Sequence, residues 1–360
     1  MANALTILLP IKDRPQYLRR LLVYLESESC DFPILIADGS SDDLSKCVVE
    51  RFLSRLKLDI TYFKFKPDTD LQSLTSKLVS VSQHISTEYV VWACDDDFYD
   101  LEALRRGILF LKANPDFSAF AGEVIDFNVL PRFGRRDRSR GTLWVREENR
   151  FCSGRYLQKE SVQLETATQR ISFTDSVFPT EAILRTSAVQ QGFQILSTIP
   201  ILQIMSINFV LSILSLWQGK FFVDHRVLLL RQDNTPGSAG SLIDAKNPTA
   251  QALERIALLD ELSKKLQVDV TPLRLSLLPL SKKLNTRESA MSGPTPNLQR
   301  RGSRSHRMLT GVRLYLRLLT AQIRGFVTRR DSSLSLVDSR LLTNENVPLL
   351  LKVESAIASF

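Results

Sequence analysis

The chain has 360 residues, of which 44% are hydrophobic and 24% charged, with 14 glycines and 15 prolines. This composition excludes collagen-like, intrinsically disordered and disulfide-scaffold proteins, and the length suggests about two globular domains. The four cysteines, Cys30, Cys47, Cys94 and Cys152, lie far apart and form no Cys-x-x-Cys pair. Their spacing argues against a zinc knuckle or a thioredoxin-like motif and indicates a reducing compartment.

The net charge of +8 is concentrated near the C-terminus. Twelve Lys and Arg residues lie between Lys282 and Arg330 against one acidic residue, Glu288, whereas the other 311 residues contain 35 basic and 38 acidic ones. A basic surface for nucleic acid is therefore not expected over most of the chain. The N-terminus enters an apolar run without a basic region or a cleavage site, so we expect no signal peptide.

The first 130 residues alternate between apolar runs and segments of helical periodicity. The apolar runs predict strands over 5–10, 33–37, 60–65, 89–94 and 117–121. Leucines repeat at helical spacing behind Pro15 and over 71–85 and 101–111. Strict alternation predicts right-handed βαβ units, and hence an α/β protein with a mostly parallel, doubly wound sheet and helices on both faces.

Beyond a basic, polar loop over 131–141, the pattern predicts a strand over 182–185, a helix over 200–217, a long strand over 221–230 and a helix over 251–266. The apolar stretch 195–217 is long enough to raise the question of a membrane span. It is interrupted by Thr198, Pro200, Gln203, Ser206, Asn208, Ser212 and Ser215. Because polar residues are this frequent, we expect a buried helix of a soluble protein instead.

The composition divides the chain into a sheet domain over 1–235, a helical extension over 236–284, a basic flexible linker over 285–307, and a basic amphipathic helix with a C-terminal tail over 308–360. The stripe formed by Val312, Leu316, Leu319, Ile323 and Phe326 lies beside Arg313, Arg317 and Arg324 on a helix over 308–330. Such a helix either packs on the domain or lies on an anionic membrane surface. Both interpretations remain open.

Polar clusters follow three of the predicted strands, at the edge where an open parallel sheet binds ligands. They are Pro-Ile-Lys-Asp-Arg-Pro over 10–15, Asp-Gly-Ser-Ser-Asp-Asp over 38–43 and Asp-Asp-Asp over 95–97. Three successive carboxylates repel one another unless a cation or hydrogen-bond donors compensate them, and a hard divalent ion with oxygen ligands does so. The alternative is an acidic turn that caps the helix beginning near Leu101. We favour a metal site.

These segments resemble the motifs of one family. LTILLPIKDRPQYLRRLLVYL is similar to the first strand and helix of the GT-A nucleotide-sugar glycosyltransferases, family 2-like, whose Pro-Thr-x-Asn-Arg-Pro segment begins the nucleotide site. ILIADGSSDD resembles that family's Asp-Gly-Ser-x-Asp segment, and VVWACDDDFYD resembles its DxD motif, in the same order over about the first 110 residues. Later, EAILRTSAVQQGF is similar to the family's strand and Gly-Phe turn.

The resemblance implies a GT-A catalytic domain over 1–235 and a metal cofactor, Mn²⁺ or Mg²⁺. The nucleotide-sugar site it implies comprises Pro10, Asp13, Arg14, Asp38, Asp95 and Asp96, with Asp95 and Asp97 as metal ligands. Asp38 would face the nucleobase or ribose, and Asp97 would also serve catalysis. The competing interpretations are a turn-forming side chain for Asp38 and a surface salt bridge for Arg14.

The chain also departs from the family pattern. The family's Thr is Ile11 here, and its Asn is Asp13. Inverting members carry a carboxylate, often Glu-Asp, after the Gly-Phe turn, where it deprotonates the acceptor hydroxyl. Residues 197–203 read Ser-Thr-Ile-Pro-Ile-Leu-Gln instead, and the nearest upstream acids are Asp175 and Glu181. Asp175 is taken as the candidate catalytic base.

The resemblance thus predicts a metal-dependent, inverting hexosyltransferase that moves a sugar from a nucleotide-sugar donor to a glycan or lipid-linked acceptor, in cell-surface polysaccharide or lipid-linked glycan synthesis. It would be cytoplasmic, with peripheral contact to an anionic membrane and no nucleic-acid partner. One alternative is a nucleotidyltransferase, although 10–15 lacks the glycines expected of its phosphate loop. Another is a non-catalytic, glycosyltransferase-like binding protein, which would explain the missing Glu-Asp.

Overall fold

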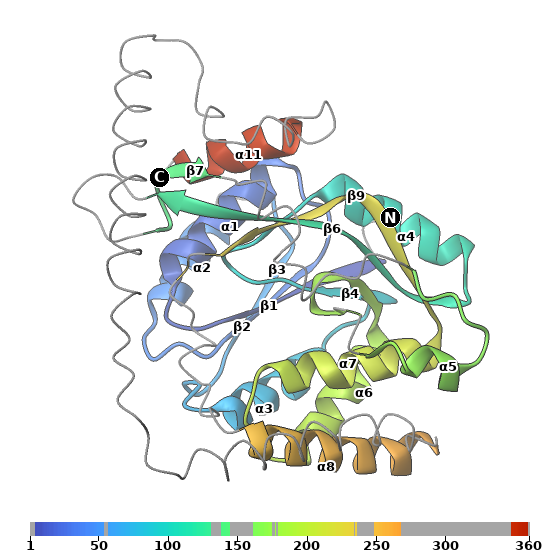
Figure 1. Cartoon of the computed structure of the whole chain (residues 1–360). Helices are drawn as coiled ribbons and strands as arrows, with labels where there is room; N and C mark the ends of the chain where they lie inside the picture. The colour runs from blue at the N-terminus through green and yellow to red at the C-terminus, as the bar shows by residue number, and fades with distance from the viewer. Residues whose placement is uncertain are drawn as a thin grey trace, which may run out of the picture.

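A computed structural model gives the fold of the chain (Figure 1). It describes residues 4–53, 57–130, 138–144, 161–174, 177, 179–233, 235, 248–267 and 347–358. In these residues nine strands form one sheet with the order β3-β2-β1-β4-β8-β6-β9-β5, and β7 pairs with β6 off this path.

Half of the sheet consists of parallel strands. These are β1 (Leu5–Ile11), β2 (Ile34–Asp38), β3 (Ile60–Lys64) and β4 (Tyr89–Trp92), with β1 between β2 and β4. β1 and β2 are buried almost throughout, because helices cover both faces of the sheet. The predicted strands in this half are confirmed to within two residues.

The other half of the sheet contains antiparallel pairs. It is built from β5 (Phe98–Tyr99), β6 (Phe117–Leu130), β7 (Thr142–Trp144), β8 (Ile183–Arg185) and β9 (Lys220–Gln232). β8 lies antiparallel between β4 and β6, whereas β6 and β9 are parallel. Four strand pairings in the described chain are parallel and four are antiparallel, so the α/β sheet is mixed.

Strand β6 continues nine residues beyond its predicted end at Ala121. The next residue, Gly122, resembles a strand terminator in the sequence. In the fold it allows β9 to approach closely, because a Cβ at this position would lie 2.6 Å from Leu228 Cβ.

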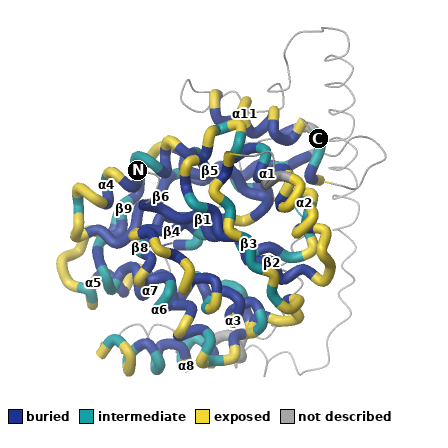
Figure 2. Tube along the Cα trace, turned by 180° about the vertical axis from the view of Figure 1, so that it is seen from behind, coloured by how far each residue is buried: buried dark blue, intermediate teal, exposed yellow. Residues whose placement is uncertain are grey.

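Helices cover the sheet in two layers (Figure 1). One core cluster contains α1 (Pro15–Ser27), α2 (Leu44–Leu53), α4 (Leu101–Ala113) and α11 (Val347–Ala358). The opposite cluster contains α3 (Leu71–Ser82), α5 (Ala167–Ile171), α6 (Thr186–Ser197), α7 (Met205–Gln218) and α8 (Pro248–Leu266). Figure 2 shows the buried residues concentrated in the strands and on the inner sides of these helices.

Helix α7 occupies the apolar stretch that raised the question of a membrane span. It begins at Met205, later than predicted, and ten of its 14 residues are buried against the sheet and neighbouring helices. None of the helices in the described part of the chain combines the length and the apolar character needed to cross a membrane.

The end of the chain returns to the sheet domain. Helix α11 packs against α1 and β7, and Lys352 Nζ donates to Glu28 Oε2. The predicted linker over 285–307 and the predicted amphipathic helix over 308–330 both lie outside the described residues.

Candidate active site

A cavity of about 280 Å³ opens beyond the carboxyl ends of β1, β3 and β4, where an open α/β sheet binds its ligands. Its ionisable walls are formed by Lys12 and Arg14 after β1, Asp68 and Lys77 after β3, Cys94, Asp96 and Asp97 after β4, and Glu181 and Arg231 on the far side. The remaining walls include the apolar side chains of Trp92, Ile204 and Ile207 and the amide of Asn208. Of the predicted site residues, Pro10, Arg14, Asp96 and Asp97 line this cavity.

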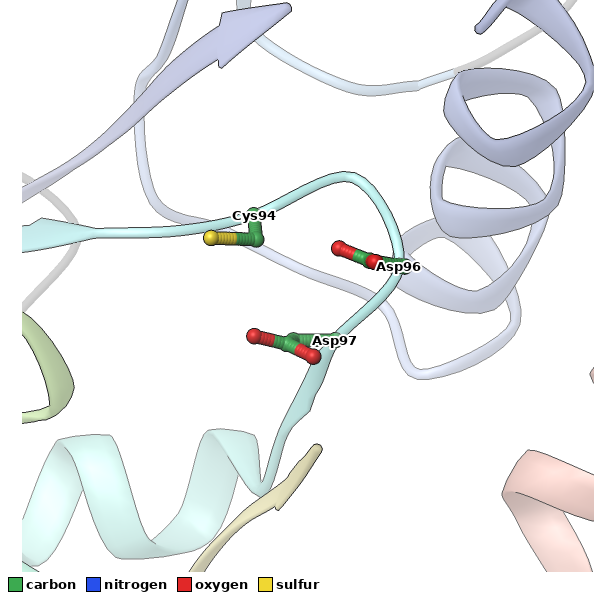
Figure 3. Close-up of side chains that lie close together, drawn as sticks. All are labelled: Cys94, Asp96 and Asp97. Atoms are coloured by element: carbon green, nitrogen blue, oxygen red, sulfur yellow. The ribbon is translucent and has the colours of Figure 1, made fainter. Parts of the chain in front are cut away.

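The acidic turn after β4 brings three potential metal ligands together (Figure 3). Ligand atoms of Cys94, Asp96 and Asp97 all lie within 4.8 Å of one another. Asp95, which the family motif paired with Asp97, is not part of this group among the described residues. Its Oδ1 atom accepts a hydrogen bond from Arg14 instead.

Arg14 neutralises much of the charge on this turn. It donates to Oδ1 of Asp95 and, over 3.0 Å, to Oδ2 of Asp96. The Arg14 side chain is only 13% exposed, so its ion pairs with Asp95 and Asp96 belong to the site and are not surface salt bridges. Burial nevertheless raises the pKa of Asp95 to about 7, against the opposing effect of Arg14. A paired guanidinium is one reason why consecutive carboxylates can be buried here.

A second arginine supports the same turn from behind. Arg20 is fully buried and donates to the backbone oxygens of Asp96 (3.1 Å) and Ser139 (3.3 Å). Its guanidinium lies 5.0 Å from the Tyr17 ring centroid and 4.9 Å from that of Phe98. Burial lowers the pKa of Arg20 to about 10. Sequence reasoning missed this residue, although a cation beside Leu21 and Leu22 on an apolar helix face was a visible signal.

Asp97 connects the turn to the last long strand. Its Oδ1 atom accepts a 3.0 Å hydrogen bond from the backbone N–H of Gln232 in β9. Burial raises the pKa of Asp97 well above its ordinary value, and the charge on Asp96 adds to this effect, while Arg231 opposes it. A bound cation would lower this pKa and hold the carboxylate ionised.

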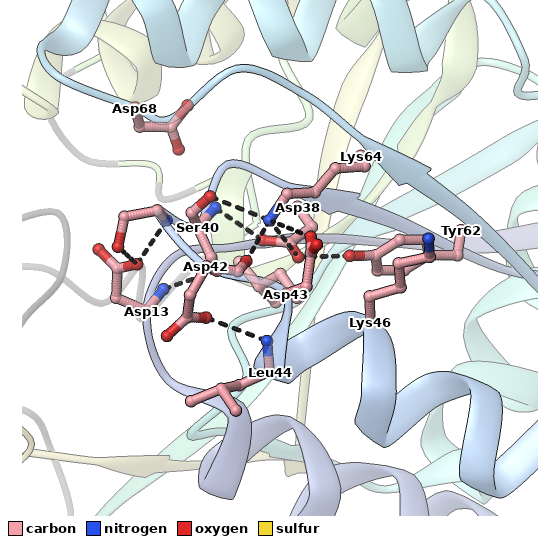
Figure 4. Close-up of polar contacts among 12 residues, drawn as sticks. Asp13, Asp38, Ser40, Asp42, Asp43, Leu44, Lys46, Tyr62, Lys64 and Asp68 are labelled. Carbon is pink, nitrogen blue, oxygen red and sulfur yellow. Dashed lines mark hydrogen bonds and ion pairs between the residues drawn. The ribbon is translucent and has the colours of Figure 1, made fainter.

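Asp38 is buried and does not line the cavity. Figure 4 shows its polar contacts. Its Oδ1 accepts a 2.7 Å bond from the Ser40 N–H, and its Oδ2 accepts bonds from the Tyr62 hydroxyl and from Lys64 Nζ (3.4 Å). Lys64 also donates to the backbone oxygen of Ser40 over 3.0 Å. These contacts match the turn-forming interpretation of Asp38.

Asp13 joins the first and second polar loops at the surface (Figure 4). Its backbone has a φ of 53°, a left-handed conformation that Asp tolerates better than most residues. Its carboxylate accepts bonds from the Ser41 N–H (2.7 Å) and hydroxyl (2.8 Å), and its own N–H donates to Ser40 Oγ (2.8 Å). Asp13 is exposed and is not among the residues lining the cavity.

Two cavity residues that the motif comparison missed form a buried ion pair. Lys77 Nζ donates to Asp68 Oδ2 and, over 3.3 Å, to the backbone oxygen of Ile11. Asp68 Oδ1 has no hydrogen-bond partner among the described residues. A Cβ at Gly39 would lie 2.3 Å from Asp68 Oδ2, so only glycine leaves room for this carboxylate. Burial raises the pKa of Asp68 and lowers that of Lys77.

On the opposite wall, Arg231 lies between two carboxylates. It donates to Glu181 Oε1 through Nη1, and to Asp126 Oδ1 through Nε over 2.9 Å. Burial, with a further contribution from Asp126, raises the pKa of Glu181 to about 8. The predicted base, Asp175, lies outside the described residues.

Comparisons with known proteins bear on the fold. No family model and no curated protein matches the chain. The structure resembles that of S. aureus TarS residues 1–349, with a TM-score of 0.50 and 14% identity, covering 98% of this chain and 88% of that one. The same protein in complex with UDP-GlcNAc gives a TM-score of 0.50 and 13% identity, covering 72% of this chain and 66% of that one. The mannosyltransferase PcManGT from Pyrobaculum calidifontis, in complex with GDP-Man and Mn²⁺, gives 0.44 and 12% over 88% and 81%.

At these identities the similarity to TarS concerns the fold. The chain has the GT-A type fold of nucleotide-sugar glycosyltransferases, as its sequence motifs predicted.

Proposed function

We propose that the chain is a glycosyltransferase that moves a sugar from a nucleoside-diphosphate sugar to an acceptor hydroxyl. The observation that supports this most is the composition of the cavity wall. Carboxylates suited to a divalent cation, Asp96 and Asp97, share one cavity with the cations Lys12 and Arg14 and with a separate buried carboxylate, Glu181. A sugar diphosphate needs cations for its phosphates, and an acceptor hydroxyl needs a proton acceptor.

The order of the strands suggests how the donor lies. Asp68 and Lys77 follow β3 at one end of the sheet, the acidic turn follows β4, and Glu181 precedes β8. In our proposal the nucleoside occupies the end near Asp68 and the diphosphate lies against Asp96 and Asp97. The sugar then extends toward Glu181 and Asn208.

The donor set fits a hard divalent cation. Two carboxylates converge in a partly enclosed cavity, and Mn²⁺ and Mg²⁺ both take carboxylate oxygens. We assign Asp96 and Asp97 as the protein ligands, with the thiol of Cys94 beside them and Asp95 held by Arg14. When bound, the ion supplies charge stabilisation for the departing nucleoside diphosphate.

The finer parts of the proposal rest on the family resemblance and on charge. They are inversion at the anomeric carbon, hexose transfer and an acceptor that is a glycan or a lipid-linked glycan of surface polysaccharide synthesis. The basic segment 282–330 supports a location at an anionic membrane surface, where a lipid-linked acceptor would be available.

A binding and turnover experiment tests the proposal. Thermal unfolding is measured with UDP-, GDP- and dTDP-sugars, with and without Mn²⁺, and release of nucleoside diphosphate is then measured with the sugar that stabilises the chain. We expect one base to be preferred, Mn²⁺ to increase the shift, and Asp97→Asn to abolish that increase. Asp116→Asn, a surface carboxylate, serves as the control. Binding without any release of nucleoside diphosphate would indicate a non-catalytic binding protein, and no stabilisation by any donor would contradict the proposal.

A further inference from the structure

We propose that Glu181 is the general base of the transfer reaction. In the family this role belongs to a Glu-Asp pair after the Gly-Phe turn, and this chain has no such pair there. This inference rests on the proposed function. Glu181 ends a single 3-10 turn, η4 (Pro179–Glu181), directly before β8. Because β8 lies between β4 and β6, this turn brings Glu181 into the same cavity as Asp96 and Asp97.

The residues that follow the Gly-Phe turn provide no carboxylate to the cavity. The start of α7 and the residue before it contribute Ile204, Ile207 and Asn208. Asn208 instead anchors η4, since its Oδ1 atom accepts a 2.7 Å bond from the Thr180 hydroxyl. Helix α7 therefore supports the turn that carries Glu181.

Elimination among the described residues also leads to Glu181. The carboxylates that line the cavity are Asp68, Asp96, Asp97 and Glu181. Asp68 is paired with Lys77 at the β3 end, and Asp96 and Asp97 belong to the metal group. Glu181 is the remaining cavity carboxylate in the part of the chain that the structure describes.

Glu181 has one oxygen held and one available. Its Oε1 accepts from Arg231, whereas Oε2 is buried and has no hydrogen-bond partner among the described residues. An unpartnered buried oxygen is costly for stability, so binding of a substrate hydroxyl that donates a hydrogen bond to Oε2 would be favourable. Asp126 fixes Arg231 from behind through Nε (2.9 Å) and Nη2 (3.3 Å). The arrangement is that of a base oriented by a second group, which is itself held in place.

The step is balanced without any further reactant. The acceptor oxygen forms a bond to the anomeric carbon of the donor sugar, while the bond from that carbon to the diphosphate oxygen breaks and its electron pair leaves with the nucleoside diphosphate. The hydroxyl proton moves to Glu181 Oε2. The charged groups around Glu181 are Arg231 from β9, Asp126 from β6 and Asp97 from the turn after β4.

The test compares two substitutions of the same residue in the full chain. Glu181→Gln keeps an oxygen for Arg231 but cannot take a proton, whereas Glu181→Asp keeps a carboxylate on a shorter side chain. A general base predicts a loss of kcat of about 10²- to 10⁴-fold for Gln and a smaller loss for Asp. For Gln, the donor KM and the thermal unfolding at pH 5 should change little. A structural role in holding Arg231 predicts the opposite order, because Gln preserves that contact better.

Glu88→Gln is the matched control, since Glu88 also accepts from an arginine, Arg185, but is exposed and does not line the cavity. It should retain most of the wild-type kcat. Glu181→Gln with near wild-type kcat would overturn the inference, and loss of activity in Asp175→Asn but not in Glu181→Gln would assign the base to Asp175. If the wild-type chain is active, neither of these two results contradicts the proposed function. A wild-type chain that neither binds nor turns over any donor refutes the proposed function instead.

Discussion

Lys77 of α3 donates to Asp68 inside the cavity, and each side chain is only 2% exposed. A pair buried this deeply contributes little net stability when intact, but leaves an uncompensated charge when one partner is removed. The pair also lies at the end of the cavity where we place the nucleoside. Substitutions of Lys77 and Asp68 can therefore show separately what the pair contributes to the free energy of unfolding and to nucleotide affinity.

We predict that Lys77→Met lowers the free energy of unfolding by about 3–5 kcal/mol, because Asp68 then remains buried without its cation. Asp68→Asn combined with Lys77→Met should recover much of this loss, since neither charge is left. Denaturant unfolding of the two single variants and the double variant gives the coupling. Additive losses would contradict a direct interaction. UDP, GDP and dTDP affinities of the double variant then report whether the pair contacts the nucleoside.

The contact of Arg14 with Asp95 and Asp96 predicts that Arg14→Lys is not a conservative change. A lysine cannot donate to two carboxylates in the planar geometry of a guanidinium. We expect a weaker Mn²⁺-dependent increase in thermal stability with a nucleotide sugar, because the acidic turn is no longer held. Arg106→Lys, at a more exposed arginine, is the control. If the Mn²⁺-dependent increase is unchanged in Arg14→Lys, Arg14 is not needed to hold the acidic turn for the metal.

Asp38 provides a test between its two interpretations. As the acceptor for Ser40, Tyr62 and Lys64, it should be required for stability, and Asp38→Ala should lower the free energy of unfolding by at least about 1–3 kcal/mol. Tyr62→Phe removes one of these bonds and should cost less. Nucleotide affinity, measured on the folded variant, distinguishes a turn-forming role from nucleoside recognition. A stable Asp38→Ala protein with lost UDP, GDP and dTDP binding would support the family assignment over the turn-forming role.

Glu181 predicts a pH-dependent stability. Its pKa is raised from 4.5 to about 8 in the folded chain, so the folded state retains this proton at pH values where the unfolded state has lost it. The stabilisation is fully present below about pH 4.5 and is lost as the pH rises through 8. Glu181→Gln has no such titration, so its stability relative to wild type should increase from pH 5 to pH 8. Denaturant unfolding at several pH values measures this difference, and a constant difference would contradict the raised pKa.

The basic segment predicts salt-sensitive membrane binding. The intact chain should sediment with anionic vesicles but not with neutral ones, and added salt should weaken this binding. Replacing Arg313, Arg317 and Arg324 together by Glu should abolish it while leaving the sheet domain folded. If the intact chain ignores anionic vesicles, the segment does not have the membrane role.

The sequence predicted the parallel half of the sheet because that half is built from local signals. Each strand from β1 to β4 is an apolar run, and between them the leucines behind Pro15 and over 71–85 repeat at helical spacing. The polar cluster at each strand end therefore indicated the edge that carries the cavity. Of the residues predicted for the site, Pro10, Arg14, Asp96 and Asp97 line this cavity.

The far wall of the cavity could not be predicted by the same reasoning. Glu181 lies there because β8 inserts antiparallel between β4 and β6. The sequence of a three-residue strand does not show which distant strands it pairs with. Asp95 was paired with Asp97 because the family's DxD motif implies that pair, whereas the turn after β4 brings Asp96 beside Asp97. Lys77 and Arg20 were visible as cations on apolar helix faces. The oxygens that Arg20 contacts, on Asp96 and Ser139, come from distant segments, whereas Asp68 lies nine residues before Lys77, in the loop between β3 and α3.

Helix α11 has a consequence for the chain between it and α8. Helix α8 packs on the cluster that contains α6, and α11 packs on the cluster that contains α1, so residues 268–346 begin on one face of the sheet and end on the other. The whole basic surplus of the chain lies within this span. The basic segment is thus attached to the domain at both of its ends, through α8 on one side and α11 on the other.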